Sequence, residues 1–383
     1  MNTRKASKTF LFIILWNLFL QFSVSIVFSI ADLPLSYLTT PYAMIINQLL
    51  GLLLPTVLVT KFRKENLKLL VPHKKLGGKN ILMIIGITYL IMPVMMMISG
   101  ISTFLFGANV AADLVGGLAE LQHPFLLMLL AIAVTPAIIE ELVFRGYIQS
   151  TMPKMPIGQM AFVGGLFFGI IHLNLQQFFY AFAMGVIWVI VVHYTKSILA
   201  GVLSHFLVNG SQVSLMYLAI WAARVLEDTA YGGYATDLTA ALSETNNGGF
   251  GQMILTMGIF SAITLPFAIL LLKYFVRYNK ERNLNELETE NAKQEVYNEF
   301  LAQENPNALQ ENDFSNSNDS ALYNYSWEDR NLRGANFWHN PDEVKSPWYK
   351  DPLLWVIVLI FLMMSILILM GPAIMEIAEG LEI

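Results

Sequence analysis

The sequence predicts an all-α protein, a polytopic transmembrane helical bundle of about nine spans. Of its 383 residues, 55% are hydrophobic and only 13% are charged, whereas soluble domains are about a quarter charged. The apolar residues gather in stretches of about 20, the length at which a helix crosses a bilayer. There is no cysteine, which excludes disulfides, thiolate nucleophiles and cysteine-based metal sites.

Most of the predicted spans are separated by short loops. Several contain a proline, which membrane helices tolerate where neighbouring groups satisfy the freed backbone. We expect the spans at residues 9–31, 42–60, 80–106, 124–152, 157–173, 176–194, 197–226, 251–276 and 352–375.

Basic residues are concentrated in alternate loops. The loop after the second span holds seven of them between Lys61 and Lys79, whereas the intervening loops hold mainly acidic residues. Loops rich in lysine and arginine remain cytoplasmic. We therefore expect a multi-pass protein of the cell membrane with a cytoplasmic N-terminus. The net charge of −5 gives no reason to expect a nucleic-acid partner.

The fourth predicted span carries three charges, at Glu140, Glu141 and Arg145. Charges at membrane depth are costly, face the bundle interior and often mark a functional site. Glu141 and Arg145 are four residues apart and so share one helix face. Glu140 points about 100° away and has no partner within its own helix. Desolvation disfavours the charged form of such a carboxylate. The group therefore takes up a proton more readily, which suits a general base near neutral pH. The alternative is a buried structural ion-pair cluster.

Two other spans carry polar residues. The fifth ends in His172, which follows Gly165 and Gly169, a small-residue pair that allows close helix approach. Taken alone, His172 reads as a residue at a helix end near the interface.

The seventh span has Gly201, His205 and Asn209 at a spacing of four, so these residues share one face. Taken alone, His205 and Asn209 are as readily explained by hydrogen bonds between helices. The histidines can meet Glu140 near mid-membrane only if the fourth helix extends to about residue 152.

The polar residues form three motifs in sequence order: EExxxR at 140–145, FxxxH at 168–172 and HxxxN at 205–209. Over roughly 122–213, about a quarter of the chain, the sequence resembles the CPBP intramembrane proteases. This family includes the type II CAAX prenyl endopeptidases and the bacteriocin self-immunity (Abi) proteins. Each motif alone is weak, but three in order inside predicted spans are more specific.

The resemblance implies a role for each matched residue. Glu140 would activate a water molecule for attack on the scissile carbonyl, and His172 would hold or polarise that water. His205 and Asn209 would stabilise the developing oxyanion as preorganised donors. A structural or substrate-orienting pair would be formed by Glu141 and Arg145.

Metal content is left open by the motifs. We expect no metal and no other cofactor. The alternative is a zinc ion held by Glu140, His172 and His205, since catalytic zinc usually takes three protein ligands and a water. The residue spacing does not favour a metal over a water.

The predicted function is hydrolysis of a peptide bond in a membrane-associated or lipidated protein or peptide, within the bilayer. One alternative is a non-proteolytic scaffold or immunity protein of the same fold that binds and regulates a partner protein. Another is a transporter that uses the charged cluster as a proton relay.

The segment 277–350 is acidic and holds 14 of the 28 acidic residues. Within it we expect a polar helix at Glu281–Gln303, disorder at Asn305–Ser320, and an aromatic stretch at Trp327–Trp348. That stretch would dock on the membrane or a partner, or form a solvated linker. The acidic segment and the last span favour a dedicated protein partner and weigh against simple prenyl-protein processing.

The predicted regions are N-terminal transmembrane helices (1–121), a CPBP-like catalytic core (122–226), an external loop with the eighth span (227–276), the acidic cytoplasmic segment (277–350) and a C-terminal span (351–383).

Overall fold

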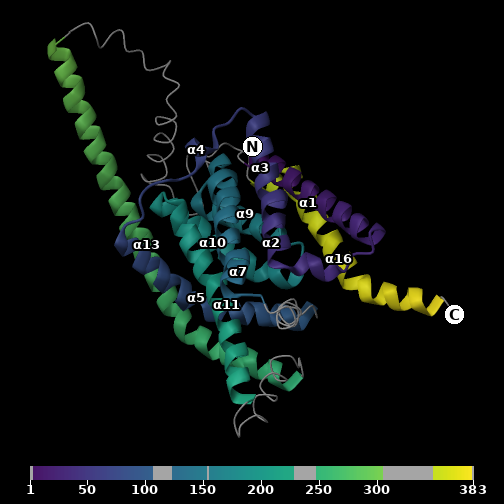
Figure 1. The fold of residues 1–383 in the computed structure, drawn as a ribbon. Helices are drawn as coiled ribbons and strands as arrows, with labels where there is room; N and C mark the ends of the chain where they lie inside the picture. Colours follow the sequence, from purple (N-terminus) through teal and green to yellow (C-terminus); the bar gives the residue numbers. More distant parts are fainter. Residues whose placement is uncertain (1–2, 107–122, 153–154, 228–246, 305–347, 382–383) are drawn as a thin grey trace.

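Long apolar helices make up most of the structure, a computed structural model (Figure 1). No β-strand occurs within the residues that it describes. Those residues are 3–106, 123–152, 155–227, 247–304 and 348–381.

Apolar helical runs lie at all nine predicted positions, so the prediction of a polytopic helical bundle is confirmed. Within the described residues, seven runs are long and apolar enough to cross a membrane, and two are shorter. The runs are α1 (Arg4–Ile30), α2–η2–α3 (Pro41–Asn47, Gln48–Leu53, Leu54–Phe62), α5 (Gly78–Phe106), α7–η3–α8–η4–η5 (Phe125–Met128, Leu129–Val134, Thr135–Glu141, Leu142–Ile148, Gln149–Thr151), α9 (Ile157–Ile170), α10 (Leu175–Thr195), α11 (Ile198–Glu227), α13 (Asn247–Glu304) and α16 (Pro352–Leu381).

The fifth span is shorter than predicted. Helix α9 has 14 residues and ends at Ile170, not at residue 173. Leu173 has a positive φ of 51°, and the Asn174 side chain accepts a hydrogen bond from the Gln176 amide at 2.8 Å to begin α10. The turn between α9 and α10 therefore takes up the residues that the sequence assigned to the helix, including His172.

Helices α9 and α10 pack closely through glycines. A Cβ atom on Gly165 would lie 2.8 Å from the Phe182 carbonyl oxygen, and one on Gly169 would lie 2.9 Å from that of Phe178. Such distances leave no space for a side chain. The predicted close approach at this small-residue pair is confirmed.

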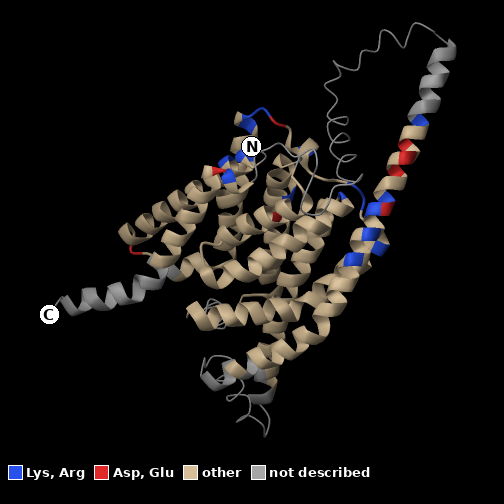
Figure 2. Cartoon of the chain, turned by 180° about the vertical axis from the view of Figure 1, so that it is seen from behind, with Lys and Arg blue, Asp and Glu red and all other residues tan. Residues whose placement is uncertain are grey.

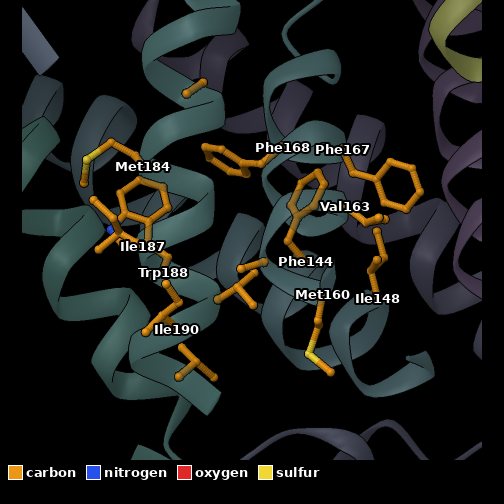
Figure 3. Packing of buried hydrophobic residues seen from close by; sticks show 14 of the residues in the cluster. Phe144, Ile148, Met160, Val163, Phe167, Phe168, Met184, Ile187, Trp188 and Ile190 are labelled. Carbon is orange, nitrogen blue, oxygen red and sulfur yellow. The ribbon is translucent and has the colours of Figure 1, made fainter. Parts of the chain in front are cut away.

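Buried aromatic and aliphatic side chains fill the space between α9, α10 and η4 (Figure 3). Phe10 of α1 stacks on Phe167 with ring centroids 4.4 Å apart. Phe144 and Phe168 pack edge to face, with centroids 5.2 Å apart. This packing fixes η4 and α9 relative to each other, and the charged motif lies at their junction.

The second span shows how the bundle accommodates a proline. Pro55 has no N–H for the carbonyl of Gly51, which is four residues earlier. Here the backbone widens into the π-helical segment η2, and Asn17 of α1 donates to the Gly51 oxygen at 2.7 Å. A neighbouring helix therefore satisfies the carbonyl that proline frees.

Helix α13 extends well beyond the bundle (Figure 1). Its outer part carries most of its charged side chains (Figure 2). This confirms the prediction of a polar helix at Glu281–Gln303. Two predicted features lie outside the described residues. They are the disorder at Asn305–Ser320 and the aromatic stretch Trp327–Trp348, except for Trp348 itself.

One end of the bundle is rich in charged side chains (Figure 2). There Lys5 at the start of α1 pairs with Glu65, which follows α3. Arg63 donates to the Tyr147 hydroxyl of η4 at 3.0 Å, and Tyr147 donates to Glu65 at 2.6 Å. These contacts place the start of the first span and the end of the second at the same end of the bundle.

The last span contacts the first span at this same end of the bundle. Asp351, directly before α16, is fully buried. Its Oδ2 accepts hydrogen bonds from Thr3 at 2.9 Å and from Ser7 at 2.8 Å. The C-terminal span is thus anchored to α1 by a specific polar contact.

Candidate active site in the membrane bundle

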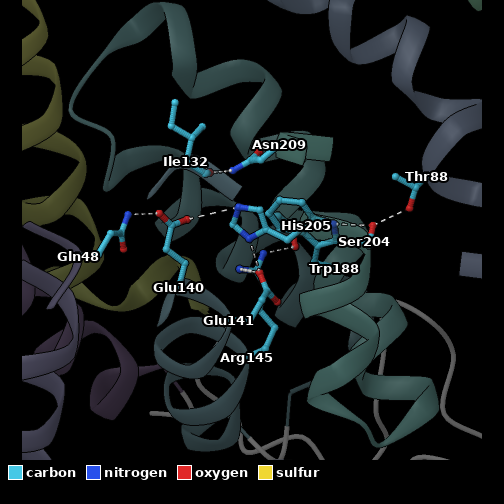
Figure 4. Close-up of polar contacts among 11 residues, drawn as sticks. Gln48, Thr88, Ile132, Glu140, Glu141, Arg145, Trp188, Ser204, His205 and Asn209 are labelled. Atoms are coloured by element: carbon cyan, nitrogen blue, oxygen red, sulfur yellow. Dashed lines mark hydrogen bonds and ion pairs between the residues drawn. The ribbon is translucent and has the colours of Figure 1, made fainter. Parts of the chain in front are cut away.

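The fourth run is helical from Phe125 to Thr151, which meets the requirement that it extend to about residue 152. Near its middle, Pro136 leaves the carbonyl of Ile132 without its helical N–H partner. The backbone is π-helical there, in η3, and Asn209 of α11 donates to that carbonyl at 2.9 Å (Figure 4). The Asn209 amide therefore supports the helix about two turns before the glutamates.

Glu141 and Arg145 form the ion pair that their spacing predicts. Arg145 Nη1 lies 3.0 Å from Glu141 Oε1, and both side chains are 0% exposed. The guanidinium carbon also lies 4.5 Å from the ring centroid of Phe168 and 5.1 Å from that of Trp188. Aromatic faces attract cations in a desolvated setting. The charge of Arg145 is therefore balanced by one carboxylate and two rings.

A glycine on α11 makes room for this pair. A Cβ atom at Gly201 would overlap Oε2 of Glu141. The spacing of Gly201 and His205 places both on the face of α11 that meets α8. The glycine of the predicted Gly201–His205–Asn209 face thus lets the carboxylate approach the α11 backbone.

Glu140 points away from this ion pair, as predicted. Its residue surface is only 7% exposed. Gln48 of η2 donates from Nε2 to Glu140 Oε1 at 2.8 Å, and Glu140 Oε2 lies 3.9 Å from Nε2 of His205 (Figure 4). The two carboxylate oxygens therefore have different environments.

His205 lies between the two glutamates. Its Nδ1 is 3.2 Å from Glu141 Oε1, and because a carboxylate only accepts hydrogen bonds, Nδ1 carries the proton. The ring stacks on Trp188 with centroids 4.2 Å apart. This leaves Nε2 directed at Glu140, where it can accept a proton or, once protonated, donate one.

A chain of hydrogen bonds holds the stacked indole. Trp188 Nε1 donates to Ser204 Oγ at 2.9 Å, and this hydroxyl lies 2.8 Å from Thr88 Oγ1 on α5. Since all three side chains are buried, the plane that His205 stacks on is well defined.

His172 lies in the turn after α9, with its ring 5.3 Å from that of Phe168. Its Nδ1 is 2.8 Å from the Phe168 carbonyl oxygen, which leaves Nε2 for other contacts. The Phe168 ring also packs on the ring of His205, with centroids 5.8 Å apart, so one aromatic side chain contacts both histidines. The histidine of the second motif therefore belongs to the same cluster, although it shares no direct hydrogen bond with Glu140 or His205 in the described part of the chain.

The side chains of the cluster differ in how much of their surface is exposed. Glu141, Arg145 and His205 are buried, whereas His172 and Asn209 are partly exposed. Gln48 is also partly exposed. A substrate could therefore approach from the side of these partly exposed groups and not from that of the ion pair.

The zinc alternative requires three ligands around one point. Among the described residues, no group of three His, Cys, Asp or Glu side chains is placed to hold a metal ion. Glu140 Oε2 and His205 Nε2 are 3.9 Å apart, and the choice between a water and a zinc ion at this site stays a prediction.

Two contributors were missed by the sequence reading: Gln48 and Trp188. Both come from spans that carry no motif with ionisable residues. Gln48 is an isolated amide in an apolar stretch, which is a weak signal for a site partner. Trp188 lies on the buried face of α10, where an aromatic residue is usually read as packing.

Residues 122–211 match the family model described as type II CAAX prenyl endopeptidase Rce1-like. The match covers the three motifs and confirms the resemblance to CPBP proteases over that segment. It supports a membrane endopeptidase as the general kind of protein. Neither a curated protein nor a solved structure was found to match.

Proposed function

We propose, on the premise that residues 122–211 form an Rce1-like core, that the chain is an intramembrane endopeptidase. It would hydrolyse a peptide bond of a membrane-associated or lipidated protein or peptide with water activated by a glutamate. The observation that carries this proposal is the position of Glu140. It is buried, lies outside the Glu141–Arg145 pair, and has one oxygen 3.9 Å from His205 Nε2.

Glu140 would act as the general base. A water molecule held between Glu140 and His172 would lose a proton to the carboxylate and attack the scissile carbonyl. Glu140 would then pass the proton to the leaving amine. His172 would orient the water through Nε2, because its Nδ1 faces the Phe168 carbonyl.

His205 would stabilise the oxyanion of the tetrahedral intermediate. In its protonated form it would donate from Nε2, while Glu141 holds the proton on Nδ1. Asn209 would contribute through the part of its amide that the Ile132 carbonyl does not use. Glu141 and Arg145 would set the orientation of His205 without touching the substrate.

The second candidate is a scaffold that regulates a partner without proteolysis. The charged outer part of α13 favours it, because this helix extends beyond the bundle. The partner would be a protein that binds within residues 277–350.

Membrane orientation is part of the proposal. Lys74, in the basic loop after the second span, pairs with Glu286 of α13 at 2.9 Å. This contact supports placing the basic loop and the outer part of α13 on one side of the membrane. We assign that side to the cytoplasmic face of the cell membrane.

Because the chain has no cysteine, single-cysteine labelling can test this orientation directly. Lys64→Cys should react only after permeabilisation and Asp32→Cys should react in intact cells; the reverse pattern would invert the orientation.

The catalytic proposal is tested with purified full-length protein in proteoliposomes. We would offer a farnesylated peptide, its unlipidated counterpart and a single-span transmembrane peptide, and follow cleavage by mass spectrometry. Glu140→Gln and His172→Ala should abolish cleavage, and Glu281→Gln on the exposed part of α13 should leave it unchanged. If cells that express Glu140→Gln and His172→Ala keep the full cellular activity of the protein, the scaffold function is the correct one.

A further inference from the structure

Gln48 lies outside the matched segment and forms a hydrogen bond with the proposed base. It belongs to η2 in the second span, whereas the family match covers residues 122–211. Its Nε2 donates to Glu140 Oε1 at 2.8 Å (Figure 4). The proposed site is therefore completed by a helix that the matched core does not contain.

The position of Gln48 is determined by the local backbone. It opens the π-helical segment η2 that precedes Pro55, and the freed Gly51 carbonyl is held by Asn17 of α1 at 2.7 Å. A Cβ atom on Gly51 would lie 2.7 Å from Asn17 Oδ1, so α1 and η2 are in close contact there. In addition, η2 packs against α8, the helix that carries Glu140. Two neighbouring helices thus restrain the segment that presents the amide.

The polarity of the contact has a chemical consequence. A carboxylate only accepts hydrogen bonds, so the nitrogen of the amide must face Glu140. A donor to the charged form of a carboxylate favours that form over the neutral acid. Because Gln48 occupies Oε1, the other oxygen is the one that faces His205.

We infer that Gln48 is a positioning residue for Glu140. It holds Oε1 of the buried carboxylate and so leaves Oε2 directed toward His205 and the attacking water. This inference rests on the proposed endopeptidase function for its catalytic meaning, but the hydrogen bond itself can be tested without a substrate.

Other titratable groups also act on Glu140 and must stay constant in the test. Arg145 and Glu141 lie on its own helical run, His205 on α11, His172 at the end of α9 and Tyr180 on α10. None of these is changed by a substitution at position 48. A change in the infrared band of Glu140 can therefore be assigned to the lost amide donor.

The experiment is infrared difference spectroscopy of the full-length protein in proteoliposomes at one fixed pH. The carboxyl band of Glu140 is identified as the band that Glu140→Gln removes. Gln48→Met has nearly the same shape without the donor, and it should move the frequency of this band, because a carboxyl stretching frequency depends on the hydrogen bonds that its oxygens accept. Asn47→Leu removes the exposed neighbouring amide and should leave the frequency unchanged.

Cleavage of the farnesylated peptide gives the catalytic arm. For Gln48→Met, kcat should fall about tenfold or more with KM little changed, which corresponds to the loss of one hydrogen bond to a charged group.

The outcomes separate the two proposals. An unchanged band in Gln48→Met overturns the positioning role, whatever the protein cleaves. A displaced band together with no cleavage of any peptide by the unaltered protein overturns the endopeptidase function and leaves the Gln48 contact intact.

Discussion

Two charged clusters meet on one helical turn, in η4, and they differ mainly in their access to water. Arg145 pairs with Glu141 in the bundle interior, where both side chains are 0% exposed. Two residues later, Tyr147 joins the Lys5–Glu65 pair at the end of the bundle, where those side chains are 46% and 20% exposed. The same kind of ion pair is therefore held in two dielectric environments.

The comparison teaches that burial, not the number of contacts, decides what each cluster contributes. An exposed ion pair typically contributes about 0–1 kcal/mol. Removing one partner of a buried pair costs roughly 3–5 kcal/mol, because it leaves an uncompensated charge. The inner cluster can therefore hold His205 rigidly, whereas the outer cluster mainly marks one end of the bundle.

The largest expected effect is that of Arg145→Met. It leaves Glu141 buried without its cation and should lower the free energy of unfolding by about 3–5 kcal/mol. Arg63→Met in the outer cluster is the matched control and should cost less than about 1 kcal/mol. Chemical denaturation in detergent micelles measures both. Equal losses would show that burial does not separate the two clusters.

A double substitution sharpens the result. Glu141→Leu combined with Arg145→Met removes both charges, and replacing a buried pair by apolar side chains is often neutral or better. The double variant should recover most of the stability that Arg145→Met loses. Its cleavage activity should remain low, because His205 loses the carboxylate that holds Nδ1.

The next effect in size is that of Gly201→Ala. Its methyl group would overlap Glu141 Oε2, and the carboxylate cannot move without weakening its contacts to Arg145 and His205. Overpacking of this kind costs about 1–3 kcal/mol. Gly210→Ala on the same helix is the control, since its nearest neighbour would be 3.6 Å away. A Gly201→Ala protein as stable as the Gly210→Ala protein would mean that the site is looser than the structure indicates.

The parts that the sequence predicted are those set by spacing within one helix. The Glu141–Arg145 pair, the separate direction of Glu140 and the small-residue contact at Gly165 and Gly169 all follow from helical geometry. The nine helical positions follow equally from hydropathy. Each of these needs only the periodicity of a single helix and the length of a bilayer crossing.

The parts that it missed depend on contacts between helices. Gln48 reaches Glu140 only because η2 packs against α8, and nothing at position 48 signals that partner. The oxyanion role of Asn209 stays a prediction, whereas the partner that its nitrogen has in the structure, the carbonyl that Pro136 frees, is not signalled by position 209. A proline in one span and an asparagine in another can be linked only once their relative heights are known.

Asn209→Leu extends the comparison from charges to neutral polar groups. It leaves the Ile132 carbonyl without a donor in the bundle, which costs roughly 1–3 kcal/mol. Made in the Glu140→Gln background, it should lower stability by the same amount as in the unaltered protein. Equal losses of stability in the two backgrounds would show that Asn209 supports the helix independently of catalysis. A loss of cleavage with no loss of stability would instead assign Asn209 to the oxyanion alone.

The smallest effect concerns the outer cluster and depends on pH. Partial burial acts to raise the pKa of Glu65, but hydrogen bonds from Lys5 and Tyr147 and the charges of Lys5 and Arg63 outweigh it, so the pKa is lowered from its ordinary 4.5. A lowered pKa means that Glu65 contributes its stabilisation above pH 4.5 and loses it as the pH falls through the folded-state value. Because the pair is partly exposed, the contribution should stay below about 1 kcal/mol. The unfolding temperature of the unaltered protein should therefore slightly exceed that of Glu65→Gln at pH 7, and the difference should decrease as the pH falls below 4.5. A difference that stays constant as the pH is lowered would show that Glu65 acts through packing and not through its charge.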